Sequence, residues 1–562
     1  MSKPTRRPLP LILIRGFGGL NTDDEKKLAY QGFNNGSVYP QKQGENYIYE
    51  GLILRFMKSD WQYQDATNVV GYYGSKLGSA PTLPGKLQYL KDITDSSKLT
   101  PKLQKLKENG VLEKFERLQE AGYFSGDRVV INPAMALHLL ESTDDPCRSI
   151  WVFRYYDLND RQFKTYGEAL VRLIDFIREL AVMQDGVKPK VNIIAHSMGG
   201  LLVREAVQRT YPESENGPRK AEDYINKIVT LGTPHRGITF QILQDWIGIR
   251  AEEELEHFNP EFQDNKENKA SFWNFEKHFP PERLLTVVGT NYRSYNNGTA
   301  TLLNRFFSTS GEYGANYNRS DGLVKQISAQ IPGVPRTFVN KCHGGFDSLI
   351  TSRESFEVAT RFLFGNVRSH LRFVKGTITR GKDLFGKSEF FLGVSIKPRA
   401  VDFELFHQSK EAENCYGPFS KEDLTDVNLT FPWADNKNLV WEGYLDTRAI
   451  LADDSRPDKD MVLRLDFYVG ERDLLGIGFS DNVIFRKQYY VRALIEKRPL
   501  ELYLHTTERF DLPDEQLNLG EKTKMAKVNG GWEFDVQGTG FEGTFRIEID
   551  KVPEDGEPIP FT

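Results

Sequence analysis

A serine at position 197 stands in surroundings that suit a catalytic nucleophile. Ser197 is the centre of the segment 195–199 (Ala-His-Ser-Met-Gly), which lies between an apolar β-type run at 190–194 and a helix-type run at 200–207. A G-x-S-x-G sequence between a strand and a helix forms a strained turn that exposes its serine, and the residues two before and two after must be small. Alanine and glycine meet that need here. The helix that follows would direct backbone N–H groups and its dipole at a developing oxyanion.

An acid and a base follow the serine in the chain order that hydrolases of the α/β type require. Asp321 lies in a Ser-Asp-Gly-Leu-Val run, and His343 follows a strand-type run at 337–340 and precedes two glycines. His343 would take the proton of Ser197, and Asp321 would fix the imidazole tautomer. Asp321 could instead be an ordinary turn residue or a helix N-cap, because Ser-Asp-Gly is common turn chemistry. Asp264 competes poorly, since it precedes the strand expected to carry the acid.

A glycine-rich turn near the N-terminus would complete the oxyanion hole. The apolar run Leu9–Ile14 leads into an Arg-Gly-Phe-Gly-Gly turn at 15–19, and glycines let a backbone approach a substrate oxygen closely. We expect the N–H groups of Phe17 and Met198 to bind the oxyanion, each lowering the barrier by about 3 kcal/mol. Arg15 is expected to support this turn through a salt bridge, with binding of an anionic group as the alternative.

These motifs resemble those of bacterial lipases and esterases of the α/β-hydrolase superfamily. Segment 195–200 is similar to the elbow of Bacillus-type lipases, and the Leu-Gly-Thr-Pro-His-Arg-Gly loop at 231–237 is similar to one in many lipases and in glycolipid-anchor inositol deacylases. Segment 321–324, with Ser-Ala at 328–329, resembles the acid-bearing segment of secreted lipases and lecithin–cholesterol acyltransferases. The resemblance spans roughly Leu9 to Phe364 and implies the triad already named. It departs from the lipase pattern at position 15, where arginine replaces the usual histidine.

Two further histidines and two insertions surround these motifs. His196 would point away from the serine hydroxyl and is interpreted as a packing residue. His235 is expected to stabilise its own loop, with a place in the wall of the site as the alternative. The insertions lie at roughly 21–145 and 238–281, and the second contains a largely apolar helix-type run with Trp246. Insertions of this kind commonly cover an active site, so we expect Trp246 to belong to a cap or else to pack on the core.

The elements that must position these residues divide the chain in two. Strand-type runs at 9–14, 149–155, 191–194, 227–231, 284–288 and 337–340 alternate with helix-type runs such as 166–180 and 354–364. They predict an α/β fold over residues 1–368, a three-layer α/β-hydrolase sandwich with a mostly parallel sheet. Alternating β-type runs with Gly, Pro and Asp turns predict an all-β, sandwich-like domain over 369–562. Its segment 376–386 resembles the opening of C2 membrane-binding domains, which implies peripheral contact with a lipid surface.

The composition limits which partners the chain is expected to bind and in which compartment it is expected. The chain has 562 residues, a formal net charge of −5 and a pI near 6.1, which argues against general binding of nucleic acids or of anionic membranes. No run approaches the ~20 apolar residues of a membrane span. The three cysteines, Cys147, Cys342 and Cys415, are odd in number and widely spaced, which fits a reducing compartment. With no signal-peptide core before the first strand, we expect a cytoplasmic protein, with signal-independent export or a trimmed chain as alternatives.

The sequence therefore predicts a serine hydrolase of carboxylic esters, of lipase or esterase type, acting on an ester or lipid without metal or cofactor. The alternatives are a phospholipase or an acyltransferase with the same triad, and a non-catalytic binding protein on a hydrolase scaffold. Every predicted catalytic residue precedes Phe364. We therefore expect removal of the chain beyond about Ser369 to spare hydrolysis of a small soluble ester but to weaken activity on aggregated lipid or another large substrate.

Overall fold

The computed structural model divides into two compact units. The first comprises Met1–Leu284 and Gly345–Thr351, and the second Leu285–Gly344 and Ser352–Thr562. The residues that the structure describes are 8–16, 33–34, 37–38, 47–48, 51–66, 84–93, 95–124, 133–142, 145–155, 162–182, 186–237, 257, 259–292, 320–345, 347–379, 388–399, 401–421, 438–449, 460–473, 482–495, 497–507, 522–528, 530–553 and 559–560.

Five parallel strands form the sheet of the first unit. Their order is β4 (Gln64–Asp65), β5 (Ser149–Phe153), β1 (Leu11–Ile14), β6 (Val191–His196) and β7 (Ile225–Leu231). Every residue of β1, β5 and β6 is buried, as expected for parallel strands that are covered on both faces. Ile14, the last residue of β1, pairs with Ala195 of β6. The loops that follow these two strands therefore leave the same edge of the sheet side by side.

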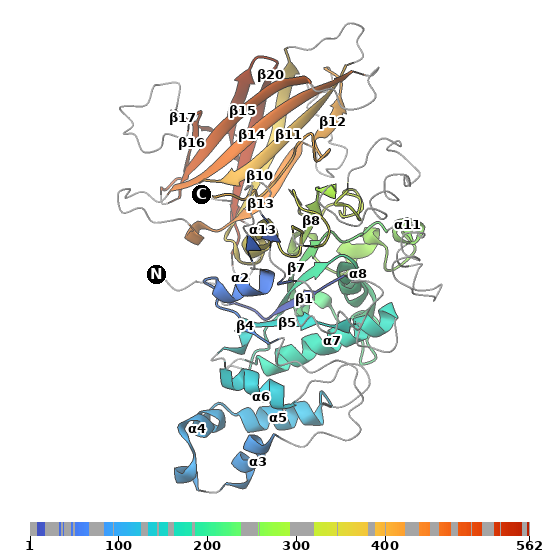
Figure 1. Cartoon of the computed structure of the whole chain (residues 1–562), viewed down its shortest axis with the longest axis vertical. Helices are drawn as coiled ribbons and strands as arrows, with labels where there is room; N and C mark the ends of the chain where they lie inside the picture. The colour runs from blue at the N-terminus through green and yellow to red at the C-terminus, as the bar shows by residue number, and fades with distance from the viewer. Residues whose placement is uncertain are drawn as a thin grey trace. The chain divides into compact units, whose positions relative to one another are not determined.

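Helices accompany this sheet. α7 (Phe163–Leu180) packs against α8 (Met198–Glu205), and both helices are labelled near the strands of this sheet in Figure 1. α8 follows β6 after one residue. The insertion predicted at 21–145 is largely helical where the structure describes it. Its elements are β2 (Ser37–Val38) paired with β3 (Tyr47–Ile48), α2 (Leu52–Lys58), α3 (Gly85–Asp92), α4 (Pro101–Glu108), α5 (Val111–Glu120) and α6 (Pro133–Ser142). The second insertion contributes α11 (Pro260–Asp264).

Two more parallel strands belong to the second unit. β8 (Leu284–Gly289) pairs with β9 (Arg336–Val339), and α13 (Arg353–Phe364) follows them. β9 is the last strand in the order of the seven-stranded sheet, β4-β5-β1-β6-β7-β8-β9. The predicted α/β class with a mostly parallel sheet is confirmed. The boundary expected after residue 368 lies within β10, which begins at Val367, and residues 285–344 and α13 group with the sheets that come after them.

The rest of the second unit consists of two antiparallel sheets, which confirms the predicted all-β domain. One has the order β13-β10-β20-β19-β18, with β21 on β20, and the other the order β12-β11-β14-β15-β16-β17. Phe467 of β14 contacts Phe545 of β20 with ring centroids 4.6 Å apart, so the sheets share an aromatic core. The bounds are β10 (Val367–Ile378), β11 (Ser388–Pro398), β12 (Tyr416–Phe419), β13 (Leu439–Leu445), β14 (Asp460–Asp473), β15 (Asn482–Leu494), β16 (Glu501–His505), β17 (Lys522–Lys524), β18 (Ala526–Val528), β19 (Gly531–Gly538), β20 (Phe541–Lys551) and β21 (Ile559–Pro560). The C2-like segment 376–386 falls mostly outside the described residues.

Candidate active site

Ser197 forms the turn between β6 and α8. Its backbone has φ 53° and ψ −128°, a conformation that non-glycine residues rarely adopt. Two hydrogen bonds hold the turn: the Ser197 N–H donates to the Leu231 carbonyl (2.9 Å), and the Gly200 N–H donates to the Ser197 carbonyl (3.0 Å). Such strain persists only where the surrounding structure enforces it, and it clusters at functional sites.

Three glycines leave room for this turn. A Cβ added to Gly16 would stand 2.3 Å from the Ser197 Cβ and 2.9 Å from its Oγ, so the backbone after β1 passes directly against the serine side chain. A Cβ on Gly199 would meet the Ile14 carbonyl oxygen at 2.6 Å, and one on Gly200 would meet the Thr233 hydroxyl at 2.1 Å. The elbow therefore needs its small residues because β1 and the loop after β7 pack against it.

The predicted oxyanion donors are only partly described. Met198 is the first residue of α8, so its N–H has no acceptor within the helix and can serve an external oxygen. Phe17 lies outside the described residues, but Gly16 before it brings the chain to the serine hydroxyl. Arg15 is half-buried, and its carbonyl accepts a hydrogen bond from the Tyr155 hydroxyl (3.1 Å), which ties the turn after β1 to the end of β5.

Asp321 and His343 form a buried pair in the second unit. The carboxylate Oδ2 lies 2.8 Å from Nδ1 of His343, and the two side chains are 1% and 4% exposed. Oδ1 of Asp321 accepts hydrogen bonds from the backbone N–H groups of Leu323 (3.0 Å) and Val324 (2.7 Å). The N–H of His343 donates to the Asp321 carbonyl (2.9 Å), so the backbones of the two residues are joined as well as their side chains. With Nδ1 facing the carboxylate, the neutral ring carries its proton there, and Nε2 is the atom that can accept a proton.

The chain between β9 and His343 is held on both sides. The Val339 carbonyl accepts hydrogen bonds from the backbone N–H (3.1 Å) and the hydroxyl (3.3 Å) of Thr290, just after β8. The buried ammonium of Lys341 lies 3.4 Å from the carboxylate of Glu354 on α13. His343 therefore follows a strand, β9, whose end is fixed by Thr290 just after β8 and by Glu354 on α13.

His235 and Arg204 occupy the interior of the first unit. His235 is fully buried, and its Nε2 lies 3.0 Å from the Thr230 hydroxyl. Burial, with the nearby Arg204 charge, holds the pKa of His235 well below its ordinary value, so the ring is neutral. Arg204 donates to the carbonyls of His235 (3.0 Å) and Ala270 (2.5 Å) and to the side chain of Gln263 (2.9 Å). Burial lowers the pKa of Arg204 to about 9.

Arg204 thus connects the nucleophile-bearing helix with the second insertion. The described part of that insertion, from Asn259 onward, packs on α8 through this guanidinium. It also packs on the helical turn after α8 through Gln208, whose amide donates to the carbonyls of Lys269 and Ser271. Trp246, the residue expected in a cap, lies outside the described residues. The side chain of His235 contacts Thr230 of β7, and its roles in the loop and toward substrate stay predictions.

A comparison with protein families addresses the same region. Residues 145–288, which run from before β5 to the end of β8 and include the elbow, match the model of the PGAP1-like alpha/beta domain. The chain contains an α/β-hydrolase domain. A comparison with curated protein sequences gave no match.

Solved structures similar to the chain resemble it only loosely. The product of the gene lin2722 from Listeria innocua has a TM-score of 0.23 at 16% identity, over 39% of this chain and 74% of that one. Phospholipase PlaB from Legionella pneumophila has a TM-score of 0.26 at 12% identity, over 60% and 82%. Lipase 1 from Pelosinus fermentans has a TM-score of 0.17 at 15% identity, over 30% and 64%. None of these likenesses is close enough to transfer a substrate.

The α/β-hydrolase domain brings the predicted residues together in two groups. Ser197 meets the backbone of Gly16 in the first unit, and Asp321 meets His343 in the second. In the described part of the chain, no cluster of three or more His, Cys, Asp or Glu side chains is arranged to hold a metal ion. None of the helices there is long and apolar enough to cross a bilayer.

Sequence reasoning missed two supporting residues. Gly16 was expected to approach a substrate oxygen, whereas its contact with the Ser197 side chain depends on the packing of β1 beside β6. Arg204 was not among the predicted residues. The signal that could have found it is an Arg and a Gln four residues apart after the elbow, since such pairs share one helix face.

Proposed function

We propose that this chain is a serine hydrolase that cleaves carboxylic esters, with Ser197 as nucleophile, His343 as general base and Asp321 as the group that orients it. The observation that carries the proposal is the backbone of Ser197, held at φ 53° with Gly16 against its hydroxyl. Strain of this kind is used to hold a nucleophile above a sheet. The buried Asp321–His343 pair, 2.8 Å apart, supplies the other half of the machinery.

The reaction would proceed through an acyl-enzyme. Ser197 Oγ attacks the ester carbonyl carbon while its proton passes to Nε2 of His343. The oxyanion is bound by the Met198 N–H and by the predicted donor Phe17. Collapse of the tetrahedral intermediate breaks the bond to the alcohol, which leaves with the proton from His343. Water then attacks the acyl carbon by the same route, and release of the acid restores Ser197.

Asp321 keeps the imidazole productive throughout. Its Oδ1 is held by two backbone N–H groups, so Oδ2 stays directed at Nδ1 of His343. This arrangement keeps the proton on Nδ1 and stabilises the imidazolium once the serine proton has moved. Because both groups are buried, the interaction takes place in a low dielectric, where it is stronger than in water.

The proposed substrates are esters of fatty acids. This class is implied by the likeness of the elbow and of the 231–237 loop to those of lipases. Hydrolysis of p-nitrophenyl esters of increasing chain length, of a triacylglycerol and of a phospholipid would rank the candidates. A preference for the phospholipid would favour the phospholipase alternative, and acyl transfer to an added alcohol in preference to water would favour the acyltransferase.

The deciding experiment measures the serine directly. We expect a fluorophosphonate probe to label the wild-type chain and to leave Ser197→Ala unlabelled. Ser197→Ala and His343→Ala should each lower turnover of p-nitrophenyl butyrate by several orders of magnitude, and the double variant by little more, since the residues act as a unit. Ser214→Ala is the matched control. A Ser197→Ala protein with near-native turnover would end the proposal, and an unlabelled, inactive wild type would favour a binding protein.

A further inference from the structure

Segment 403–414, between β11 and β12, lies against the strand that leads to the catalytic base. The backbone N–H of His407 donates to the carbonyl of Phe338 (3.0 Å), and the hydroxyl of Thr337 donates to the carbonyl of Leu405 (2.5 Å). The rings of Phe338 and Phe406 are 5.5 Å apart. Because β9 ends the strand order, the all-β domain supplies partners to the outer edge of the hydrolase sheet.

The same segment also binds the part of the chain that carries the acid. The side-chain amide of Gln326, five residues after Asp321, donates to the Ala412 carbonyl (3.0 Å), and this contact is buried. The guanidinium of Arg353, on α13, lies over the ring of Phe403, 4.9 Å from its centroid. Acid-bearing and base-bearing segments are thus attached to one stretch of the all-β domain.

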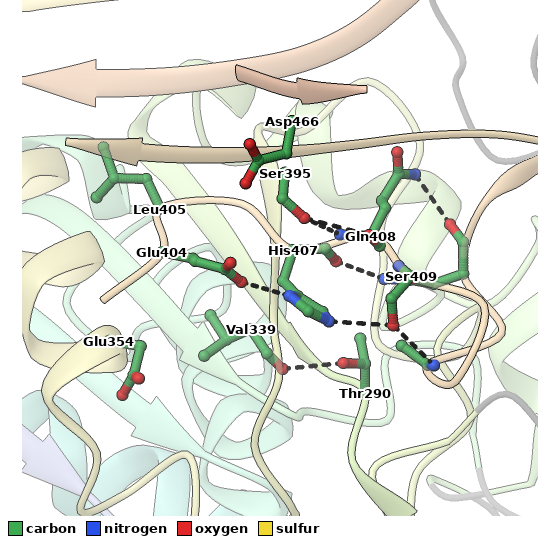
Figure 2. A network of polar contacts seen from close by, with 12 residues as sticks. Thr290, Val339, Glu354, Ser395, Glu404, Leu405, His407, Gln408, Ser409 and Asp466 are labelled. Carbon is green, nitrogen blue, oxygen red and sulfur yellow. Dashed lines mark hydrogen bonds and ion pairs between the residues drawn. The ribbon is translucent and has the colours of Figure 1, made fainter. Parts of the chain in front are cut away.

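Segment 403–414 has an internal network that gives it a fixed shape. Figure 2 shows the imidazole of His407 between the carboxylate of Glu404 and the hydroxyl of Ser409, which is 3.2 Å from Nε2. The side-chain amide of Asn414 donates to the His407 carbonyl (2.6 Å). Burial would raise the pKa of Glu404, but the hydrogen bond and charge of His407, with the charges of Lys397 and Arg464, outweigh it and lower that pKa. The carboxylate therefore stays ionised and keeps its hold on His407.

We propose that segment 403–414 is a positioning element for the Asp321–His343 pair, and that the all-β domain thereby sets the rate of ester hydrolysis. The inference rests on the proposed function. Its physical reason is that Thr337 and Gln326 tie the base and the acid to the same rigid stretch. A misplacement of about 1 Å in a catalytic group can cost about a hundredfold in rate. Removal of the chain beyond Ser369 takes away the partners of Thr337, Phe338 and Gln326. On this proposal the truncation should therefore lower the hydrolysis of small esters as well, in contrast to the expectation from the sequence.

The segment contains an acid, a histidine and a serine that are bonded in the order of a hydrolase triad: Glu404, His407 and Ser409. A second interpretation is therefore that Ser409 is a nucleophile. Ser409 Oγ, however, already accepts a hydrogen bond from the Ala412 N–H (3.1 Å), and that bond closes the turn at 409–412. We therefore assign Ser409 to the shape of the segment. If Ser409 were a nucleophile, Ser409→Ala would abolish esterase activity and probe labelling that Ser197→Ala leaves intact.

The test separates positioning from stability by removing one hydroxyl. Thr337→Val deletes the bond to Leu405 and keeps the side-chain shape, whereas Thr337→Ser keeps the hydroxyl. In the full-length chain we expect Thr337→Val to lower kcat for p-nitrophenyl butyrate, and the rate of fluorophosphonate labelling of Ser197, by about tenfold with KM nearly unchanged. Thr337→Ser should restore both. Gln326→Leu, which acts on the acid side, should lower kcat in the same way.

Thr447→Val removes a hydroxyl that is bonded to Asn366 (2.7 Å), outside the segment, and should lower Tm without changing kcat. Wild-type kcat and labelling rate in both Thr337→Val and Gln326→Leu, whatever their Tm, would overturn the inference. A wild-type chain that neither hydrolyses esters nor takes the probe would instead overturn the proposed function, so the two failures are distinguishable.

Discussion

Replacement of Gly16 by alanine tests whether the turn after β1 holds the nucleophile in place. The added Cβ would stand 2.3 Å from the Ser197 Cβ, and 3.0 Å from the His196 carbonyl oxygen, where ordinary contact begins at 3.4 Å. The obstructing atoms are a Cβ and a backbone oxygen, which cannot rotate away. The chain after β1 and the elbow must therefore separate by about 1 Å in a close-packed interior.

The displacement of about 1 Å sets the expected losses of kcat and of folding free energy. A shift of about 1 Å in the nucleophile relative to the oxyanion donors costs about a hundredfold in kcat, or about 2.7 kcal/mol of barrier. Overpacking should also cost about 1–3 kcal/mol of folding free energy. Turnover of p-nitrophenyl butyrate and Tm should be measured for Gly16→Ala beside Gly85→Ala, whose added Cβ meets nothing within 4 Å. A Gly16→Ala protein that keeps kcat within tenfold of wild type would refute the argument.

Two further substitutions probe the acid and the pH response. Asp321→Asn keeps the two bonds to Oδ1 but offers an N–H to His343 Nδ1, which favours the wrong tautomer. By analogy with other triads kcat should fall by about 10⁴, and a loss below tenfold would move the acid elsewhere. Burial, with the charges of Arg209 and Arg204, lowers the pKa of His257 from 6.5 to about 4. Between these two pH values His257 is protonated in the unfolded chain and neutral in the folded chain. The free energy of unfolding therefore falls as pH drops from 6.5 towards 4. His257→Phe, which keeps the stack on Phe163, should reduce that fall by at most about 3 kcal/mol in urea titrations at pH 7 and 4.5. An unchanged slope would contradict the assignment.

The strands and the elbow were predictable because their signals are local. β6, Ser197 and α8 are consecutive, and the apolar runs of a parallel sheet stand out against polar turns. The order serine, acid, histidine likewise picked out Asp321 and His343, which the fold pairs across 22 residues. These inferences required only chain order and the known geometry of a strand–turn–helix unit.

The supporting contacts could not be predicted because they join distant segments through neutral groups. Arg204 is held by carbonyl and amide oxygens up to 66 residues away, so no pattern of opposite charges marks its partners. The bond from Thr337 to the Leu405 carbonyl spans 68 residues and ends on a backbone atom, which every residue possesses. Segment 403–414 has no strand or helix periodicity, and its role depends on the place where the all-β domain meets β9.

The covered edge of β9 also bears on how the chain is made. During synthesis the α/β part leaves the ribosome first, and residues 403–414 follow more than sixty residues after β9. Until they arrive, the backbone N–H and C=O groups on that edge are open to strands of other chains, which is how aggregation begins. The all-β domain therefore closes a vulnerable edge on every newly made molecule, and expression of the α/β part alone should yield insoluble protein.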